Sequence, residues 1–495
     1  MMDSIDTWHD RASALAFEGR MFIDGAYVTA ASGEGFASLN PATGEKLTDI
    51  AAGGAVDVDR AVASGRKAFA SGIWSRKSPS DRGATLVRFA ALVEAHAEEL
   101  ALLETLDMGK PISDSLSVDL PLSISCLRWY GESVDKIYDE IAPTPGTALS
   151  LMKRAPLGVV GAVVPWNFPL MMACWKIAPI LAAGNSVVLK PAEQSSLSAI
   201  RIAALAVEAG IPPGVFNVVT GMGETAGKAL GLHMDVDCIA FTGSTEVGKL
   251  FMQYSGQSNL KRVGLECGGK SPNIIFEDAP DIDAAAEAAA WGIFYNQGEV
   301  CNAGSRVLVH ESIAERVIGK IVETGRAMRI GDPLDPATQI GSLVDGTQTA
   351  RVLDYIAIAR QEGARLVSGG GQPAEGGCFV EPTVFADVTA SMRIAQEEVF
   401  GPVLSVLTFR DEDEAVKIAN DTIYGLAAGM WTSDLNRTFR VSDALQAGVV
   451  WVNCFDHGHI SSPFGGFKQS GFGRDKSLHA LDKYTDVKTT WINLG

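Results

Sequence analysis

Short apolar runs alternate with helical periodicity through the middle of the chain. Runs at 158–164, 186–189, 215–219 and 236–241 are each followed by apolar residues at three- and four-residue spacing. This alternation is typical of an α/β protein with a parallel sheet covered by helices on both faces. Because such sheets bind ligands beyond the carboxyl ends of their strands, we predict a dinucleotide-binding domain here.

The pattern on either side predicts further elements. Turn dipeptides between residues 20 and 52 favour a small β element, and apolar spacing predicts helices within 57–107 and 113–138. After residues 268–269, both glycine, the alternation restarts and predicts a second α/β domain. The alternating stretch 484–492 would form a long exposed strand edge, so we expect another subunit to pair with it.

Length and composition describe a globular protein with an acidic surface. The 495 residues exceed what one hydrophobic core usually serves, and 47% of them are hydrophobic. Acidic residues outnumber basic ones by 59 to 41, which gives a formal net charge of −18. This charge disfavours nucleic acids and anionic membranes as partners, and it is compatible with cationic substrates.

The cysteine pattern points to a reduced, cytoplasmic setting. The seven cysteines are spread along the chain without a CxxC pair, so they predict neither a disulfide framework nor a zinc ribbon. We therefore expect no metal site. The N-terminal residues lack the order of a signal peptide. Three prolines interrupt the most apolar region, 155–175, which excludes a membrane span there.

Cys301 stands in a glycine-bracketed turn between an Ala-rich helical run and a short apolar strand. Gly298 and Gly304 let the backbone bend and bring other groups close. A thiol in such a turn is placed for nucleophilic work, although a lone cysteine is more often a small buried hydrophobe. The other motifs decide between these interpretations.

Two motifs follow the first strands of the predicted sheet. Asn167, in PWNFP, offers an amide donor that could stabilise an oxyanion, or it could cap a helix. Lys190 and Glu193, in KPAE, could both reach a ribose, or they could form a solvated surface pair. The Glu193 carboxylate would repel the 2′-phosphate of NADP, which favours NAD.

Three further motifs suggest a cofactor crevice with a base beside it. The glycine-rich turn 241–248 could hold a pyrophosphate at a helix N-terminus, although it is not GxGxxG. Glu266 lies beside paired glycines as a candidate general base, with a salt-bridged or capping role as the alternative. Glu398, in the acidic turn 396–402, could hold a sugar hydroxyl or cap a helix. Together these motifs favour a nucleophilic role for Cys301.

Over nearly its whole length the chain resembles the NAD(P)-dependent aldehyde dehydrogenase superfamily. The matching motifs are PWNFP (165–169), KPAE (190–193), FTGSTEVG (241–248), LECGGKSP (265–272), NQGEVCNAGSR (296–306), EEVFGP (397–402) and PFGGFKQSGFGR (463–474). The two ends of the chain look closer to a bacterial branch acting on γ-glutamyl-γ-aminobutyraldehyde, 4-guanidinobutyraldehyde and related ω-amino aldehydes.

The resemblance implies a fold of three parts. A Rossmann-like NAD-binding domain would comprise 1–137 and 157–267, and an α/β catalytic domain 268–470. A small β oligomerisation element would comprise 138–156 and 478–495.

The resemblance also implies a role for each site residue. Cys301 would attack the aldehyde, Asn167 and the Cys301 N–H would hold the oxyanion, and Glu266 would activate water to cleave the thioester. Lys176 would relay protons from that base. The implied cofactor residues are Trp166, Lys190, Glu193, Gly243, Ser244, Thr245, Glu246, Val247, Gly248, Glu398 and Phe400. The implied substrate residues are Phe168, Trp175, Phe294, Asp119, Asp456 and Phe464, with the two acids as possible anchors for a distal ammonium or guanidinium or as water-facing groups.

Several positions depart from the family pattern. Glu299 stands where Gln is usual, and Cys267 stands where Leu or Met is usual. Asp486 replaces a Glu often assigned to the proton relay, which puts its role in doubt. Asp107 resembles a monovalent-cation position of the family.

These observations predict an NAD-dependent oxidoreductase that converts an ω-amino, γ-glutamylamino or guanidino aldehyde to its acid, in amine or polyamine catabolism. A broad-specificity aliphatic or betaine-type aldehyde dehydrogenase, a CoA-acylating relative and a non-catalytic protein of the same fold are the alternatives. The resemblance implies a homo-oligomer, either a tetramer or a dimer.

Overall fold

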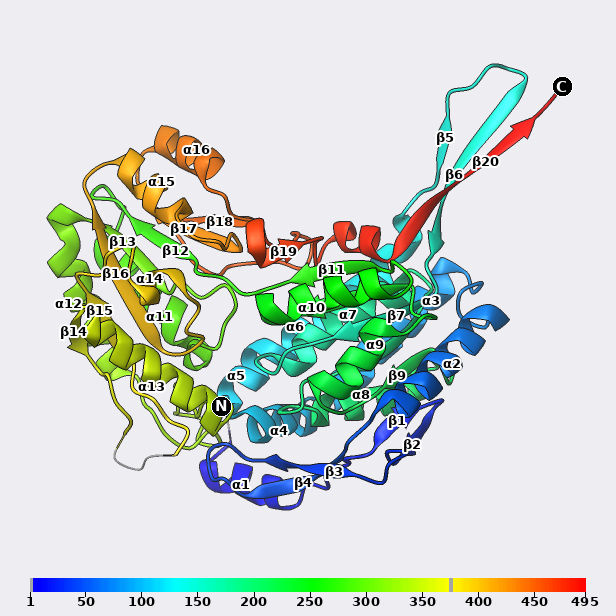
Figure 1. The fold of residues 1–495 in the computed structure, drawn as a ribbon, viewed down its shortest axis with the longest axis horizontal. Helices are drawn as coiled ribbons and strands as arrows, with labels where there is room; N and C mark the ends of the chain where they lie inside the picture. Colours follow the sequence, from blue (N-terminus) through cyan, green and yellow to red (C-terminus); the bar gives the residue numbers. More distant parts are fainter. Residues whose placement is uncertain (1–2, 374–376) are drawn as a thin grey trace.

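The computed structural model describes residues 3–373 and 377–495. Figure 1 shows two helix-covered sheets side by side and a narrow arm that projects away from them. The chain passes from the first sheet to the second between Glu266 and Pro272.

The first sheet has a parallel centre with antiparallel strands at its edges. Its order is β19 (Gly471–Phe472), β11 (Arg262–Glu266), β10 (Cys238–Thr242), β7 (Val159–Val163), β8 (Ser186–Lys190), β9 (Phe216–Val218), β1 (Met21–Ile23) and β2 (Ala26–Val28). β11, β10, β7, β8 and β9 run parallel. Every residue of β7, β8 and β10 is buried, which is why these strands appear in the sequence as continuous apolar runs.

Helices cover both faces of this sheet. One face packs against α2 (Ala55–Ser71), α9 (Lys228–Leu232) and α10 (Thr245–Gln257). The other face packs against α7 (Pro169–Ala182) and α8 (Leu197–Glu208), with α3 (Pro79–Ala95), α4 (Ala97–Met108) and α6 (Leu120–Ser133) outside them.

The predicted helical region 57–107 is divided into three helices. Gly72 ends α2 with a left-handed φ of 79°, and Ser78 caps the next helix ahead of Pro79. The predicted helix 113–138 is interrupted at its start, because residues Ser115–Asp119 form a π-helical turn between α5 (Ile112–Asp114) and α6.

The second sheet carries parallel strands with one antiparallel edge. Its order is β14 (Arg365–Ser368), β15 (Thr383–Ala386), β16 (Val403–Phe409), β13 (Arg306–His310), β12 (Pro272–Ile275), β17 (Ala427–Trp431) and β18 (Val449–Val452). Its helices include α11 (Ile282–Phe294), α12 (Ala314–Ala327), α13 (Gly346–Gln361), α15 (Glu412–Asn420) and α16 (Leu435–Ala444).

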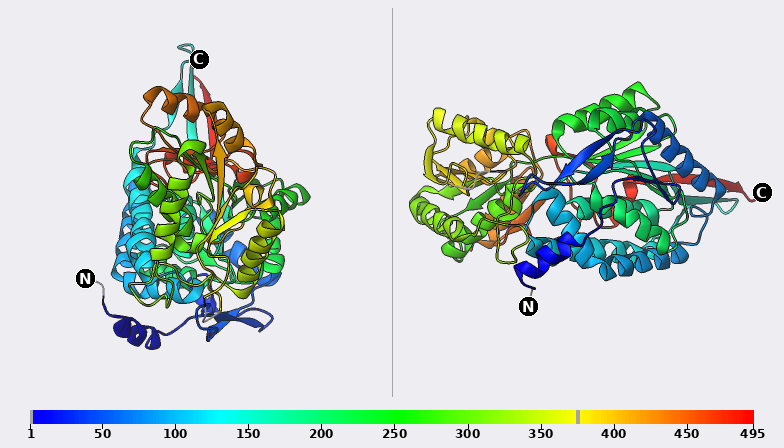
Figure 2. Two further views of the ribbon diagram at one scale, coloured as in Figure 1. Left: turned by 90° about the vertical axis from the view of Figure 1, so that its left-hand side faces the viewer. Right: turned by 90° about the horizontal axis from the view of Figure 1, so that it is seen from below.

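The arm is a three-stranded antiparallel sheet. β20 (Thr485–Asn493) pairs with β6 (Ala148–Pro156), which pairs with β5 (Glu140–Ala142). Figure 2 shows the arm projecting from the body in two further views. β20 pairs with β6 of the same chain along one edge and is the edge strand of this sheet, so the expected pairing with another subunit along its other edge stays a prediction.

Two remaining strands, β3 (Gly35–Leu39) and β4 (Lys46–Ala51), form a small hairpin of their own near the N-terminus. Among residues 3–373 and 377–495, none of the helices is long and apolar enough to cross a membrane.

Candidate active site

Cys301 follows a left-handed turn at the end of α11. Asn296, Gln297 and Gly298 have φ angles of 47°, 57° and 74°. Glycine adopts this conformation without penalty, and a Cβ on Gly298 would also overlap the Gly401 carbonyl. For the other two residues the conformation costs about 1–2 kcal/mol each, so the surrounding structure must hold them.

Buried hydrogen bonds hold this turn. The Gln297 side chain accepts from the Gly341 N–H at 3.0 Å, and the Glu299 carboxyl accepts from the Val344 N–H at 3.1 Å. Burial raises the pKa of Glu299 well above its usual range. Burial thus favours an uncharged side chain at this position, as the usual Gln is.

Asn167 connects the turn to the first sheet. It lies just beyond the carboxyl end of β7, and its Nδ2 donates to the Glu299 carbonyl at 2.7 Å. The Asn296 side chain donates to the same carbonyl at 3.2 Å. Because an amide group carries two N–H donors, Asn167 keeps a second hydrogen beyond the one it donates to Glu299.

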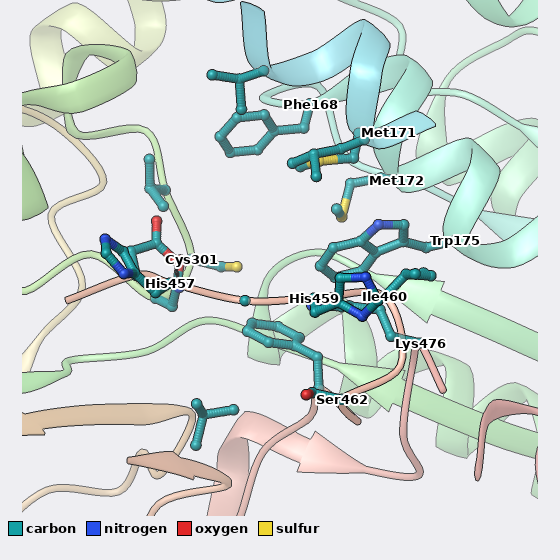
Figure 3. Close-up of a pocket in the computed structure, with 18 of the residues that line it drawn as sticks. Phe168, Met171, Met172, Trp175, Cys301, His457, His459, Ile460, Ser462 and Lys476 are labelled. Carbon is teal, nitrogen blue, oxygen red and sulfur yellow. Dashed lines mark hydrogen bonds between the residues drawn. The ribbon is translucent and has the colours of Figure 1, made fainter. Parts of the chain in front are cut away.

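A cavity of about 210 Å³ opens in front of the Cys301 sulfur. Figure 3 shows the sulfur projecting between two walls. One wall is Phe168, which directly precedes α7, with Met171, Met172 and Trp175 on that helix. The other wall is the loop that carries His457 to Ser462. The aromatic lining comprises Phe168, Trp175, Tyr295, Trp451 and Phe464. Phe168 stacks on Tyr295 at a ring separation of 6.3 Å, and Trp175 meets Phe464 edge-on at 5.3 Å.

Two predicted substrate residues lie elsewhere. Phe294 is fully buried inside the second half of the molecule, with its ring against Gly325, and the next residue, Tyr295, lines the cavity in its place. Asp119 is fully buried in an ion pair with Lys110, whose ammonium lies 4.2 Å from the Phe168 ring centroid. The expectation that Phe294 and Asp119 line the tunnel was therefore wrong.

Asp456, in contrast, lines the cavity. One of its oxygens accepts a hydrogen bond of 2.6 Å from Asn302, the residue after the nucleophile candidate. Burial raises the pKa of Asp456 to about 6, although the Asn302 hydrogen bond opposes the shift. The group is therefore mostly ionised at neutral pH.

Glu266 is the last residue of β11 and is buried at the junction of the two sheets. Burial raises its pKa to about 8, the neighbouring Asp475 adds to the shift, and Lys176 and Lys483 oppose it. One carboxyl oxygen has no hydrogen-bond partner in the described part of the chain. Burial likewise raises the pKa of the Cys301 thiol well above its usual range, with Glu266 contributing, so the thiol needs a base to become a nucleophile.

A buried group of charges stands behind Glu266. Lys176, on α7, pairs with one oxygen of Asp475, and Lys483 pairs with the other. Burial lowers the pKa of Lys176, and the two lysines hold the pKa of Asp475 below its usual range despite its burial.

This arrangement bears on Asp486, whose part in a proton relay the sequence left in doubt. Asp486 lies on β20 with its side chain 63% exposed, and it pairs with Arg262 at 2.9 Å. The carboxylate that reaches Lys176 is Asp475, which directly follows the matched motif 463–474. The position of Asp475 next to that motif is the feature of the sequence that could have identified it.

Several of the predicted cofactor residues lie at the carboxyl ends of parallel strands. Lys190, the last residue of β8, pairs with Glu193 at 2.9 Å. After β10, Gly243 leads into α10, where the Ser244 hydroxyl accepts from the Val247 N–H at 3.2 Å. The first turn of this helix, including Thr245 and Glu246, supplies N–H groups without helical partners, which suits a pyrophosphate.

Close packing under that turn involves two small residues. A Cβ on Gly248 would lie 2.9 Å from the Cys267 sulfur, so α10 approaches the sheet closely at this point. The space between α10 and the sheet is therefore narrow, and Cys267 fits it with a smaller side chain than the usual Leu or Met.

The remaining predicted cofactor residues are Trp166, Glu398 and Phe400. The Trp166 and Phe400 rings meet edge-on at 5.2 Å. A Glu398 oxygen accepts from the Gly269 N–H at 3.0 Å, and burial raises the pKa of Glu398 to about 7. Ribose acceptors, a helix N-terminus and aromatic rings at one sheet edge fit a nicotinamide dinucleotide.

Asp107 is buried with both oxygens engaged, one by the Ser38 hydroxyl at 2.6 Å and one by the Leu197 N–H at 3.0 Å. Within the described part of the chain, no group of three or more His, Cys, Asp or Glu side chains is arranged to hold a metal ion.

Comparison with known proteins identifies the relatives of the chain. The model of the "Aldehyde dehydrogenase family" matches residues 27–490. The NADP/NAD-dependent aldehyde dehydrogenase PuuC of Escherichia coli is 52% identical over 487 residues, covering 98% of each chain.

Two solved structures match along their whole length. An indole-3-acetaldehyde dehydrogenase complexed with NAD+ is 59% identical with a TM-score of 0.99, covering 100% of both chains. A γ-glutamyl-γ-aminobutyraldehyde dehydrogenase from Burkholderia cenocepacia is 56% identical with a TM-score of 0.98 and the same coverage.

The raised pKa of Glu266 predicts an alkaline rate profile. Only the ionised carboxylate can act as a base, and its fraction rises until the pH passes about 8. With turnover limited by thioester hydrolysis, kcat should rise about tenfold per pH unit below neutrality. Steady-state rates of Glu266→Gln should be low and flat over the same range. A wild-type profile already level from pH 6 would contradict this role.

Proposed function

Because the chain belongs to the aldehyde dehydrogenase family, we propose that it oxidises an aldehyde to the carboxylic acid with NAD, through a thioester on Cys301. The observation that carries the proposal is the position of the Cys301 sulfur. It projects into an aromatic cavity, with Asn167 bonded to its turn and Glu266 behind it.

In this mechanism the Cys301 thiol releases its proton to solvent water and its sulfur adds to the aldehyde carbon. The resulting oxyanion receives hydrogen bonds from the second N–H of Asn167 and from the Cys301 backbone N–H. NAD, when bound, would accept the hydride that leaves the adduct, and loss of this hydride gives the thioester. Glu266 then takes a proton from water, the hydroxide displaces the thiolate, and the carboxylic acid leaves.

Lys176 and Asp475 would carry the proton away from Glu266. Their ion pair is buried beside Glu266, and both change the charge that this base experiences. A CoA-acylating reaction would have no use for a base at this position, so hydrolysis is favoured.

For the substrate we propose an aldehyde with a polar, nitrogen-containing chain. The ionised Asp456 in the cavity wall supports a cationic group, and one relative acts on γ-glutamyl-γ-aminobutyraldehyde according to its name. An arylacetaldehyde is the second candidate. The aromatic lining and the 59% identity to an indole-3-acetaldehyde dehydrogenase favour it.

We also propose that the arm joins copies of this chain into a dimer or tetramer. Val487, Trp491 and Leu494 on its C-terminal side are 60% or more exposed, and exposed apolar surface of this kind marks interfaces. A reduced cytoplasmic setting is supported by the seven cysteines, all of which have free thiols.

Removal of the nucleophile should separate catalysis from cofactor binding. Cys301→Ala should abolish NADH formation, because no other group can form the thioester, while NAD affinity measured by calorimetry should change less than about threefold. Cys454→Ala is the matched control, since Cys454 is another half-buried cysteine but does not line the cavity. Retained turnover in Cys301→Ala would refute the mechanism.

The Lys190–Glu193 pair predicts a preference for NAD. Replacing the carboxylate in Glu193→Gln removes repulsion of a 2′-phosphate and should raise kcat/KM for NADP relative to NAD about tenfold. Glu208→Gln, on the exposed face of α8, is the control. Wild-type enzyme that uses both cofactors equally, with no change in Glu193→Gln, would remove this role.

The proposed anchor at Asp456 predicts a selective loss. In Asp456→Asn, KM for 4-aminobutanal should rise about tenfold or more, because a charge-assisted contact is lost. KM for hexanal should change little. Equal changes for both aldehydes would show that Asp456 supports the cavity wall without binding the ammonium.

A further inference from the structure

The aldehyde cavity also contains a cation, Lys476. Figure 3 places its side chain beside Trp175 and Ile460, on the opposite side of the cavity from His457. Its Nζ lies 5.3 Å from the Trp175 ring centroid and against Gly458. The ammonium therefore faces the space that the substrate chain must cross.

Within the described residues, this ammonium has no directly bonded counterion. Among residues 3–373 and 377–495, Nζ of Lys476 forms neither an ion pair nor a hydrogen bond, whereas Lys110, Lys176 and Lys483 each pair with an aspartate. The neighbouring carboxylate, Asp475, is already held by two of those lysines. A half-buried ammonium without a counterion offers a binding site for an anion.

The backbone around Lys476 is strained and firmly held. Lys476 and Ser477 have φ angles of 60° and 50°, which are unfavourable for residues other than glycine. The Ser477 N–H donates to the Ile460 carbonyl at 2.7 Å, and the Tyr130 hydroxyl donates to the Ser477 carbonyl at 2.9 Å. The segment is thus fixed in a conformation that aims the lysine into the cavity.

Few other charged or titratable groups of the described residues line the cavity. They are Asp456, His457 and His459, together with the phenol of Tyr295 and the thiol of Cys301. Asp456 is held by Asn302 and does not pair with Lys476, so one acidic and one basic group face the same space separately. Burial lowers the pKa of Lys476 and Asp456 opposes the shift, and a bound carboxylate would likewise favour the ammonium form.

We propose that Lys476 binds a carboxylate on the distal part of the aldehyde, so that the enzyme favours substrates such as γ-glutamylamino aldehydes over aldehydes ending in a bare ammonium. This inference rests on the proposed aldehyde oxidation at Cys301. It adds a specificity-determining residue that recognises an acid group, opposite in sign to the anchor at Asp456. A dipolar amino-acid head group satisfies both charges.

The test compares three aldehydes, γ-glutamyl-4-aminobutanal, 4-aminobutanal and hexanal, in wild type, Lys476→Met and Lys476→Arg. Loss of a charge-assisted contact should raise KM for the γ-glutamyl aldehyde in Lys476→Met about 10- to 100-fold, with kcat retained. KM for hexanal should stay within about twofold, and Lys476→Arg should keep most of the preference. Lys67→Met, at an exposed site on α2, is the matched control.

Calorimetry separates failure of this inference from failure of the proposed function. N-(γ-glutamyl)propylamine, which has the head group but no aldehyde, should bind wild type at least about tenfold more tightly than it binds Lys476→Met. Equal KM changes for hexanal and the γ-glutamyl aldehyde, or equal binding of the amide, would overturn the role of Lys476. If none of the aldehydes were oxidised, the proposed function would be refuted. Binding of the amide would still show whether Lys476 recognises the head group.

Discussion

The site depends on one local constraint, the left-handed turn that precedes Cys301. Asn296 and Gln297 would leave this conformation in a free chain, but their amides and the Glu299 carboxyl are bonded to loops from other parts of the fold. Asn167 extends the same network to the first sheet. The thiol is therefore positioned by contacts from both sheets, and the distance between nucleophile and cofactor crevice is fixed by packing.

A second constraint is the balance of buried charge. Asp475 brings a carboxylate to the back of Glu266, and two lysines keep it ionised. Burial raises the pKa of Glu266 itself to about 8, so the carboxylate is a stronger base than an exposed one. On the cavity side, Asp456 and Lys476 remain separate, so the wall presents both signs of charge to a substrate. The chemistry and the specificity thus use different buried charges.

Much of this arrangement could be predicted from the sequence. β7, β8 and β10 are buried on both faces, so each appears as an apolar run, and the motifs that follow them meet at one sheet edge. The wrong predictions concern residues whose role depends on the direction in which the side chain points, or on a contact with a residue far away in the sequence. Tyr295, and not Phe294, faces the cavity because α11 ends there, and a π-helical turn rotates Asp119 toward Lys110. The contact between Lys176 and Asp475 joins residues 299 positions apart, and no local pattern encodes it.

The most direct test of a Cys301 thioester is mass spectrometry of the Glu266→Gln protein after mixing with NAD and an aldehyde. Without the base, hydrolysis should stall and one acyl group per chain should accumulate on the peptide that contains Cys301. Absence of an adduct despite NADH formation, or an acyl group on another cysteine, would contradict the account.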